Sequence, residues 1–447
     1  MDLTNNESYI KSCLQIAKKI LASHGKLDLV NEKSEVINSY ENLEHIEEPQ
    51  DIHVLESITP EQLNRAKKCV LEGKFFSEHA AAGEATRLKL GTKYLINIPK
   101  TLSTEKIAKM ISEEKDKSVS EEDVINEASC KPEELLSLSV GTRHMLQFAF
   151  DITKLAKENN YDVVEVLAKQ KMLIILNEST SEKIINEFLK YNFFGFKREN
   201  VMFMIQNSYH GITYNEDEAI YNTDSPKRLH NHGQMVMQQT MDDQIFFLDT
   251  NEKRKYLKSN EYGNIIKTME DKLSYNIEDL DFLLGAIDFE SLALALTKAD
   301  EGYGMMMEVV ANNSENPQKG GMAAFDKKHG KNVMIEYFQL KGIKNKDIKF
   351  LNKNFNHYPR PYDSWQKLKE KGVNMHVTIK HGHLYFQPVQ GDINFLVKTA
   401  FVQRSVLKPI QSWKSSATTP LAIKYMRKQD KQIGFKEFAK RFVTELN

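Results

Sequence analysis

The sequence has few cysteines and no long apolar run. Three of its 447 residues are cysteine (Cys13, Cys69 and Cys130), and they form no CxxC pair. Such a sparse, odd set indicates a reducing compartment and argues against a structural zinc site. No apolar stretch approaches the roughly 18–20 residues that a transmembrane helix needs, so we expect no membrane partner.

An excess of one charge and an export signal are also lacking. Lys and Arg number 61, Asp and Glu number 62, and the formal net charge is −1. A near-neutral balance gives no electrostatic footprint for general nucleic-acid binding, so we expect no nucleic-acid partner. The N-terminus has no basic stretch followed by an apolar one and does not resemble a secretory signal. We therefore expect a cytoplasmic protein, and export by a machine that reads another signal stays open.

What is present is the composition of a globular protein, with 40% hydrophobic and 28% charged residues. The length predicts two or three packed units rather than one core. We predict an N-terminal helical segment over residues 1–70 and a nucleotide-binding catalytic domain over 71–340. A charged insertion at 101–135 is a candidate surface for a protein partner, and 341–447 would form a smaller α+β domain.

Short apolar runs predict the strands of an α/β domain. The runs at 172–176 and 201–205 flank a helical segment at 181–191, which is the spacing of a βαβ unit with parallel strands. We therefore predict a Rossmann-like, mostly parallel sheet that binds ligands at the carboxyl ends of its strands. Three further strand candidates follow, at 282–287, 305–310 and 332–337.

One helix start is marked by its capping residues. Thr59 would cap the helix, Pro60 suits the first helical position, and Gln62 stands three residues after the cap. The sequence therefore predicts that a helix begins at residue 60.

The segment AAAGEATRLKLGTK, residues 80–93, carries the main chemical signal. Small residues let the backbone pass close to a ligand, and successive N–H groups in a tight loop form a concavity that binds anions. Thr86 adds a hydroxyl, Arg87 can hold two phosphate oxygens at once, and Lys93 supplies a point charge. Taken alone, the same residues could equally form a solvated turn that leads into a helix, because such motifs are weak signals.

Five segments, in the same order, resemble the nucleotide-sugar pyrophosphorylases of the UDPGP type. Residues 80–93 resemble the family loop L-A-G-G-x-G-T-R-L-G-x-x-x-P-K, and residues 193–206 resemble F-F-G-L-x-x-x-x-V-x-F-F-x-Q. HNHGQ at 230–234 resembles H-G-H-G-D or P-x-G-N-G, and AID at 286–288 resembles V-D-N. The last segment joins NPQKGG at 316–321 with VMIEYFQL at 333–340, and it resembles P-x-E-K-V-G followed by V-V-E-Y-S-E-L. The similarity is to the UTP-dependent sugar-1-phosphate uridylyltransferases, including the UDP-N-acetylglucosamine pyrophosphorylase branch.

This resemblance implies a GT-A-like nucleotidyltransferase fold and a reaction. UMP would pass from UTP to a sugar 1-phosphate, giving a UDP-sugar and pyrophosphate, so UTP and a sugar 1-phosphate are the implied partners. Such a transfer needs in-line positioning and neutralisation of negative charge more than a covalent nucleophile. Mg²⁺ is the implied cofactor, since a hard cation suits one carboxylate, waters and phosphate oxygens.

The resemblance also implies roles for single residues. Arg87 and Lys93 would be the catalytic residues that bind the triphosphate and the leaving pyrophosphate. Asp288 would hold Mg²⁺, and Glu336 and Lys319 would contact the sugar. The remaining predicted contacts are to the nucleotide, and they come from Ala82, Gly83, Glu84, Ala85, Thr86, Gln206, His232 and Gly233.

Several of these roles have a simpler alternative. Asp288 could cap the helix expected from Glu290, Gln206 could satisfy a strand end, and Glu336 could be the solvent-facing partner of a lysine. Two groups of histidines invite a metal site, but neither has the cysteine or the ligand spacing that zinc sites usually show. These histidines are His230, His232, His376, His381 and His383.

Other positions depart from the family pattern. Ala82 and Ala85 replace loop glycines, and a Cβ pressed against a phosphate would disturb the positioning on which catalysis depends. The family's C-terminal lysine motif, P-[VL]-K-N, has no clean copy, and Lys408 and Lys414 are candidate substitutes. These departures leave two alternatives open: a nucleotide-dependent transferase with a non-sugar, protein acceptor, or a pseudoenzyme that binds a nucleotide or UDP-sugar.

Overall fold

The computed structural model describes residues 7–24, 35–36, 40–55, 58–83, 90–215, 218–312, 315, 317–403, 411–444 and 446. Four of the predicted site residues, Glu84, Ala85, Thr86 and Arg87, lie outside these ranges, and so does Lys408. None of the helices within the described ranges combines the length and the apolar character that crossing a bilayer requires.

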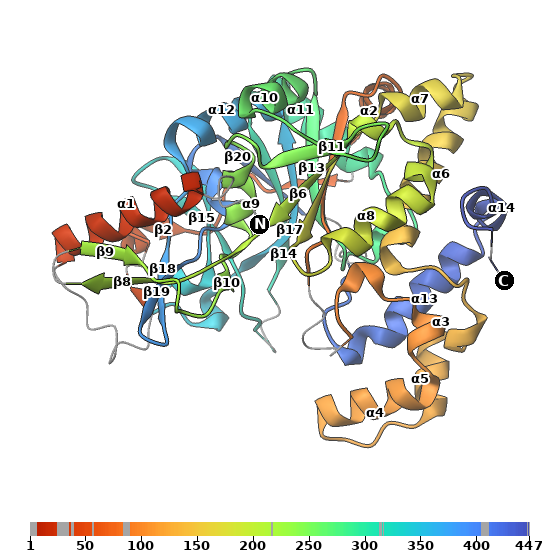
Figure 1. The fold of residues 1–447 in the computed structure, drawn as a ribbon, viewed down its shortest axis with the longest axis horizontal. Coiled ribbons are helices and arrows are strands. Elements are labelled where there is room, and N and C mark those ends of the chain that lie inside the picture. The colour runs from red at the N-terminus through yellow and green to blue at the C-terminus, as the bar shows by residue number, and fades with distance from the viewer. Residues whose placement is uncertain are drawn as a thin grey trace.

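A large mixed sheet forms the centre of the molecule (Figure 1), and 13 of its strands lie in the described residues. Those strands are β2 (Ile46–Glu47), β3 (His53–Val54), β4 (Phe75–Ala80), β5 (Lys171–Asn177), β6 (Val201–Gln206), β11 (Ile245–Leu248), β12 (Arg254–Tyr256), β13 (Asp271–Asn276), β14 (Met305–Ala311), β15 (Met322–Asp326), β16 (Lys331–Ile335), β17 (Phe350–Pro359) and β20 (Thr399–Gln403). The main path runs β12-β11-β6-β5-β4-β13-β17-β14-β20-β3. Strands β6, β5, β4 and β13 are parallel to one another, whereas β17 runs antiparallel between β13 and β14. The predicted parallel α/β core is therefore present, with antiparallel strands added to it.

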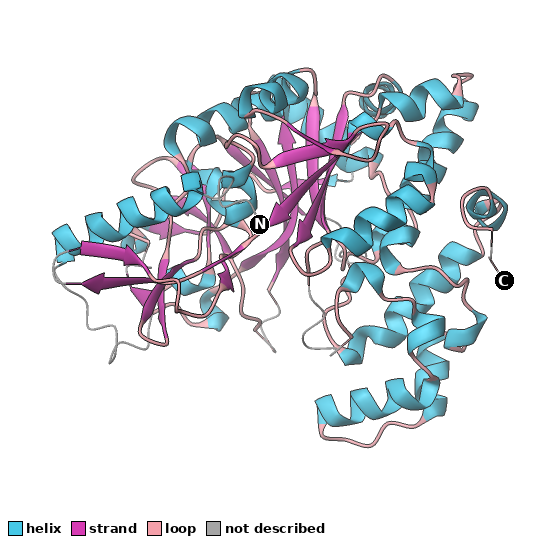
Figure 2. Cartoon of the chain, in the orientation of Figure 1, coloured by secondary structure: helices cyan, strands magenta, loops and turns pink. Residues whose placement is uncertain are grey.

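Side chains from alternate positions of the parallel strands enter two cores on opposite faces of the sheet, as the period of two requires. Phe75 and Phe203 pack on one face, and Phe76 and Met202 on the other. The first face is covered by α2 (Pro60–Leu71), α6 (Val140–Glu158), α7 (Val163–Lys169), α8 (Ser181–Lys190) and α11 (Phe289–Asp300). The second is covered by α9 (Gly233–Gln238), α10 (Ser259–Lys267) and α12 (Pro361–Lys371), so helices flank the strands on both sides (Figure 2).

A smaller antiparallel sheet stands beside the central one. Its strand order is β1 (Glu35–Val36), β18 (Val377–Lys380), β19 (His383–Phe386), β8 (Ile212–Asn215) and β9 (Glu218–Tyr221). Helix α1 (Glu7–His24) buries Tyr9, Cys13 and Ala17 in the core that this sheet shares with the neighbouring pair β7 (Ser208–Tyr209) and β10 (Arg228–Leu229). Figure 1 shows α1 lying along β9.

The charged insertion is helical and packs on the C-terminal tail. Helices α3 (Ile98–Thr101), α4 (Thr104–Lys115) and α5 (Glu121–Ala128) lie at the lower right of Figure 1. Helix α5 packs on α13 (Thr419–Asp430), which α14 (Phe435–Lys440) follows, and α4 packs on the short helix η12 (Ser416–Thr418) just before α13. Ile107, Ile111 and Val124 are buried in the same core as Ile423 and Met426 of α13. One side of the insertion is therefore part of the core, and only its other side is free to meet a protein partner.

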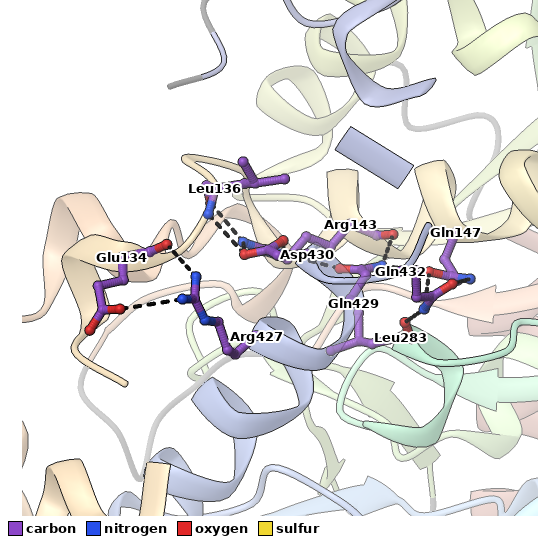
Figure 3. Close-up of polar contacts among 9 residues, drawn as sticks. All are labelled: Glu134, Leu136, Arg143, Gln147, Leu283, Arg427, Gln429, Asp430 and Gln432. Atoms are coloured by element: carbon purple, nitrogen blue, oxygen red, sulfur yellow. Dashed lines mark hydrogen bonds and ion pairs between the residues drawn. The ribbon is translucent and has the colours of Figure 1, made fainter. Parts of the chain in front are cut away.

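A buried ion pair joins α6 to α13 (Figure 3). The guanidinium of Arg143 is fully buried and contacts both carboxylate oxygens of Asp430, at 2.6 and 3.3 Å. It also donates to the carbonyl of Leu136 and to Gln429 Oε1. The backbone N–H of Leu136 donates back to Asp430, so the pair fixes the end of the insertion as well as the two helices.

The predicted boundary at residue 340 does not separate two sheets. β17 lies after that boundary, yet it supplies the strand between β13 and β14, and β20 extends β14 in parallel. The predicted N-terminal segment does not form a separate unit either. Helix α2 covers the central sheet and α1 covers the smaller one, while β2 and β3 join the central sheet. Both ends of the chain complete the central fold.

One strand prediction is wrong. Residues 282–287 form the end of a short 3-10 helix, η8 (Asp281–Leu283), and a loop whose Ala286 N–H donates to Asp151 on α6 at 2.7 Å. The strand beside β4 is β13, which has no apolar run because Lys272 and Ser274 face a polar group on the α9 side of the sheet. An apolar run indicates that a segment is buried, whatever its secondary structure. Here the apolar run at 282–287 forms a buried loop, whereas the buried strand β13 has no such run.

Candidate functional site

The candidate site lies at the carboxyl ends of β4, β5, β6 and β13, where open α/β sheets bind ligands. The small-residue segment starts there, because Ala81 N–H donates to the carbonyl of Ile175 on β5 at 2.9 Å. Asn177 at the end of β5 donates to the carbonyl of Ala82 at 3.0 Å. Lys93 N–H donates to the carbonyl of Gly83 at 3.2 Å. The two ends of the loop, at Gly83 and Lys93, are thus held side by side at this edge.

Ala82 and Gly83 are both free of left-handed strain, because neither has a positive φ. The Cβ of Ala82 belongs to the buried apolar cluster on the α9 face, beside Phe76. A Cβ at Gly83 would meet only Ile277, at an ordinary 3.8 Å. At position 82 the exchange of glycine for alanine therefore has no steric cost to the backbone.

Two lysines share one carboxylate at this edge. Lys93 is only 7% exposed, and its Nζ lies 2.7 Å from Glu278 Oε2 and 3.0 Å from the carbonyl of Trp413. Lys414 Nζ lies 3.3 Å from the other oxygen, Glu278 Oε1. Burial raises the pKa of Glu278, but the adjacent ammonium groups of Lys93 and Lys414 outweigh burial and hold it below its ordinary value. Lys414, one of the two candidate substitutes for the missing lysine motif, is thus placed beside the loop lysine.

Asp279 is a second carboxyl group that the sequence analysis missed. It is buried, and it accepts hydrogen bonds from the Asn276 N–H at 3.0 Å and the Ser412 hydroxyl at 3.3 Å. Burial raises the pKa of Asp279 to about 7. Lys353 on β17 is half-buried, and burial together with the nearby charge of Lys414 lowers its pKa. The site therefore gathers three lysines around Glu278 and Asp279.

Asp288 follows a loop rather than the strand beside β4. Its carboxylate is the N-cap of α11 and accepts the Ser291 N–H at 3.0 Å, which is the simpler alternative considered for this residue. The carboxylates that do follow that strand are Glu278 and Asp279. The adjacent residues Glu278 and Asp279 were the signal in the sequence for a carboxylate site at this edge. It was missed because the strand before them, β13, lacks the apolar pattern of a buried strand.

Three predicted nucleotide contacts, Gln206, His232 and Gly233, come together in a tight turn. Gly233 N–H donates to the carbonyl of Pro388 at 2.9 Å, and Gln390 N–H donates to His232 Nδ1 at 3.0 Å. Gln206 at the end of β6 donates to the carbonyl of the residue before His232 at 3.2 Å. Burial lowers the pKa of His232 to about 4, so the imidazole is neutral at pH 7. Because Nδ1 accepts, the proton sits on Nε2, and His232 is a preset hydrogen-bond donor.

The turn depends on the absence of a side chain at Gly233. A Cβ there would lie 2.2 Å from the carbonyl carbon of Pro388. Gly233→Ala should therefore push the turn away from residues 388–390, lower the free energy of unfolding by about 1–3 kcal/mol and weaken nucleotide binding. Urea unfolding and calorimetry measure the two effects. Gly285→Ala is the matched control, since a Cβ at Gly285 meets nothing within 4 Å, and equal behaviour of the two variants would contradict the prediction.

A buried ion pair supports the turn from below. Lys272 Nζ on β13 lies 2.9 Å from Glu78 Oε2 on β4, and these side chains are 9% and 1% exposed. Gln239 donates to the same oxygen at 2.8 Å, and Gln390 donates to Ser274 on β13 at 2.9 Å. Buried charges need such partners, because an unpaired one costs several kcal/mol. These side chains therefore fix the position of Gln390, whose backbone N–H contacts His232.

Glu336 and Lys319, the predicted sugar contacts, lie near each other. Lys319 Nζ stands 4.1 Å above the ring of Tyr337, the residue that follows Glu336. Burial raises the pKa of Glu336 to about 7, and the nearby carboxylate of Asp392 adds to this. Asp392 in turn contacts His376 Nε2 at 2.8 Å. Glu336 is thus a half-buried carboxyl group beside an Asp–His pair rather than a fully solvent-facing one.

The short helix η11 (Gln390–Phe395) connects these two groups. It carries Gln390, which contacts His232, and Asp392, which contacts His376 and raises the pKa of Glu336. Three of the histidines considered as metal ligands have hydrogen-bond partners, which are the hydroxyl of Tyr9 for His230 at 3.0 Å, the N–H of Gln390 for His232 and Asp392 for His376. Across the described part of the chain, no three His, Cys, Asp or Glu side chains are placed to hold a metal ion.

Asp279 gives the protein a stability that depends on pH. The folded protein keeps the Asp279 proton up to about pH 7, whereas the unfolded chain releases it near the ordinary value of 3.8. The wild type therefore loses stability from this group as the pH rises from about 4 to about 7. Asp279→Asn cannot ionise, so it should match the wild type near pH 4 and exceed it by on the order of 4 kcal/mol at pH 8.

Urea unfolding of both proteins between pH 4 and pH 8 measures this difference. Asp300→Asn is the control, because the pKa of Asp300 is lowered by its contact with Arg65 and its effect should stay flat over this range. A flat difference for Asp279→Asn as well would contradict the assignment of a raised pKa.

Comparison with known proteins gives a likeness of structure only. No protein-family model and no curated protein matches this sequence. The solved structure of the uridine diphosphate N-acetylglucosamine pyrophosphorylase from Trypanosoma brucei, in complex with an inhibitor, matches with a TM-score of 0.58 and 12% identity. That match covers 95% of this chain and 82% of the other. The chain has the fold of the UDP-sugar pyrophosphorylases.

The same UDP-sugar pyrophosphorylase fold appears in UDP-glucose pyrophosphorylase from Leishmania major. One substituted form of that enzyme matches with a TM-score of 0.55 and 14% identity, over 92% of this chain and 75% of the other. Another form, in complex with UDP-glucose, matches with a TM-score of 0.51 and 13% identity, over 88% and 71%. These values confirm the fold class expected from the resemblance, and they show that the sequence has diverged far from these enzymes.

Proposed function

We propose that the chain transfers UMP from UTP to a sugar 1-phosphate, releasing pyrophosphate and a UDP-sugar. The observation that carries this proposal is the start of a small-residue loop at the carboxyl end of β4, beside Lys93 and Lys414. On the fold of the UDP-sugar pyrophosphorylases, that edge is where a nucleotide would lie. The resemblance of five sequence segments supports the same reaction.

In this reaction an oxygen of the sugar phosphate attacks the α-phosphorus of UTP, and pyrophosphate leaves with the bonding electrons. The protein's task is to hold the two reactants in line and to neutralise the charge that spreads over the phosphates. Lys93 and Lys414 would exchange their contact with Glu278 for phosphate oxygens. Arg87 would add a third positive group, as the resemblance implies.

Glu278 and Asp279 fit the chemistry of Mg²⁺ better than Asp288 does. They are adjacent carboxyl groups at the carboxyl end of a central strand, whereas Asp288 is engaged as a helix cap. Mg²⁺ takes oxygen ligands from one or two carboxylates together with substrate phosphates and water. Bound there, the ion would supply further neutralisation of phosphate charge.

The turn that contains His232 would then recognise the nucleotide, and Glu336 would recognise the sugar. The Nε2–H of neutral His232 and the amide of Gln206 would donate to the nucleotide, and Gly233 would let the backbone approach it. Glu336 would bind sugar hydroxyls. Because η11 carries residues that contact both His232 and the surroundings of Glu336, it would keep the nucleotide contacts and the sugar contacts in a fixed relative position.

The test is to incubate the purified full chain with UTP, Mg²⁺ and a panel of sugar 1-phosphates and to measure released pyrophosphate and UDP-sugar. We expect product with at least one sugar, and less product when UTP is replaced by ATP, GTP or CTP. Absence of both products with every sugar and every nucleotide would overturn the proposal.

A second candidate is a nucleotide-binding pseudoenzyme, and one observation favours it. Both oxygens of Glu278 are taken by lysine ammonium groups, so the two lysines are already engaged in an ion pair within the protein. This candidate predicts binding without turnover. UTP with Mg²⁺ at 100 times its Kd should then stabilise the fold by about 2.7 kcal/mol in thermal unfolding, while the product assay stays negative.

A further inference from the structure

A cavity of about 520 Å³ lies beside α1 and shares no lining residue with the predicted nucleotide contacts. Ile16 and Ile20 of α1 line it, together with Lys331 at the start of β16 and Phe395 at the end of η11. Its size falls within the range of about 300–1,000 Å³ that is usual for small-molecule sites. Neither the fold nor the proposed transfer reaction accounts for it.

Two aromatic rings in the lining pack against each other. The rings of Tyr40 and Phe395 are stacked, with centroids 5.6 Å apart and an angle of 17° between their planes. Lys331 Nζ donates to the carbonyl of Phe395 at 3.1 Å and lies 5.9 Å from the centre of its ring. The parts of this pair that neither the other ring nor Lys331 covers offer apolar area to a ring-shaped ligand.

Two imidazoles in the lining are each oriented by a carboxylate. His376 Nε2 lies 2.8 Å from Asp392, and His329 Nδ1 lies 2.7 Å from Asp326, which also accepts the hydroxyl of Tyr40 at 2.5 Å. In each pair the ring nitrogen that faces the carboxylate carries a proton, so the tautomer of the neutral ring is fixed. The lining thus presents two imidazoles oriented by carboxylates, of which His376 is buried and His329 is exposed.

The charges around the cavity do not favour an anion. Lys331 is the one lysine or arginine in the described lining, whereas Glu41 lies in the lining and Asp326 and Asp392 lie behind the two histidines. Such a set does not select a phosphate, which needs an excess of positive charge. In the described residues, no three groups that could ligate a metal meet here or elsewhere.

Hydroxyl groups fit this lining best, because each one both donates and accepts a hydrogen bond. The amide of Asn374 offers a donor and an acceptor, the second nitrogen of each imidazole and Glu41 accept, and Lys331 donates. We propose that this cavity binds a neutral saccharide, with its ring against Phe395 and Tyr40. The described lining does not include Glu336 or Lys319, although it borders them at the His376–Asp392 pair, and sugar binding here does not depend on the proposed reaction.

The experiment is saturation-transfer NMR on the full chain, without any nucleotide, with glucose, mannose and N-acetylglucosamine as probes. We expect signals from at least one sugar, and at least a fivefold loss of those signals in Lys331→Met and in Asn374→Ala. Asn374 is exposed, so its variant keeps the test valid if Lys331→Met fails to fold. Lys327→Met, an exposed lysine outside the lining, and Lys93→Met at the nucleotide edge should keep the signals.

Three outcomes would overturn this proposal. The first is no signal from any sugar, and the second is displacement of the sugar by inorganic phosphate. The third is loss of the signals in Glu336→Gln while Lys331→Met and Asn374→Ala keep them. The last would place the sugar at the predicted acceptor contact instead. Since no UTP or sugar phosphate is present, failure of the transfer reaction leaves this result unchanged.

Discussion

Replacing Arg143 with methionine should lower the free energy of unfolding by about 3–5 kcal/mol, because it leaves the carboxylate of Asp430 buried without its partner. The side chains of this pair are 0% and 5% exposed, so water cannot take the place of the guanidinium. Figure 3 shows that the same guanidinium joins α6 to α13 and to the backbone at Leu136. Denaturant unfolding of the variant measures the loss.

Arg427→Met is the matched control for this experiment. Arg427 also lies on α13 and contacts Glu134 at 3.4 Å, but these side chains are 29% and 44% exposed. Pairs as exposed as this contribute about 0–1 kcal/mol. The double variant Arg143→Met with Asp430→Leu should regain part of the loss, since it removes the unpaired charge. Equal losses in Arg143→Met and Arg427→Met would show that burial of the pair does not matter.

Lys93→Met should reduce the rate of UDP-sugar formation by about 100- to 1,000-fold, the range found when a preorganised group that stabilises transition-state charge is removed. Lys93 is held at the end of the small-residue loop by its N–H contact with Gly83, and its ammonium group is one of two on Glu278. Methionine resembles the apolar part of the lysine side chain and removes the ammonium group, including its contact with the carbonyl of Trp413. Steady-state measurement of pyrophosphate release gives kcat and KM separately.

Lys100→Met is the control for the loop lysine, because Lys100 is exposed and lies on the short helix that follows. It should keep the wild-type rate. Lys93→Met should also keep its fold, since Glu278 retains the contact with Lys414. A wild-type rate in Lys93→Met would remove Lys93 from the catalytic group, and loss of both rate and fold would assign it a structural role instead.

The sequence predicted those parts of the fold where local pattern and burial agree. The strands at 171–177 and 201–206 are apolar at nearly every position because helices cover both faces, and this gave the βαβ unit directly. The capping residues Thr59 and Gln62 make the expected reciprocal hydrogen bonds at the start of α2. In both cases the signal is contained in neighbouring residues.

Prediction failed where a polar group is buried by distant partners. β13 carries Lys272 toward Glu78 on β4, so β13 shows no apolar run and was not predicted. Only pairing across nearly 200 residues of sequence separation explains why these charges are inside. The apolar run at 282–287 is buried against α6 as a loop, and this moved the predicted metal ligand from the strand end to the helix cap at Asp288.

The candidate site also contains residues that the sequence could identify and residues that it could not. Gln206, His232 and Gly233 lie together, and the resemblance could identify them because they belong to a contiguous turn and to the end of an apolar strand. Their contacts to a nucleotide stay predictions. Glu278 and Lys353 were missed, since what brings them to the edge is the position of β13 and β17 in the sheet. The roles of Glu84, Ala85, Thr86 and Arg87 stay predictions, as these residues lie outside the described ranges.

The position of β17 has a consequence for synthesis of the chain. β13 ends at Asn276, and the strand that pairs with its free edge begins only at Phe350. At a translation rate of about 5–20 residues per second, the nascent sheet carries an open edge for several seconds. An unpaired edge of this kind is a template for pairing with other chains. Chains released before residue 359 should therefore aggregate, and slow translation between the two strands should lower the yield of folded protein.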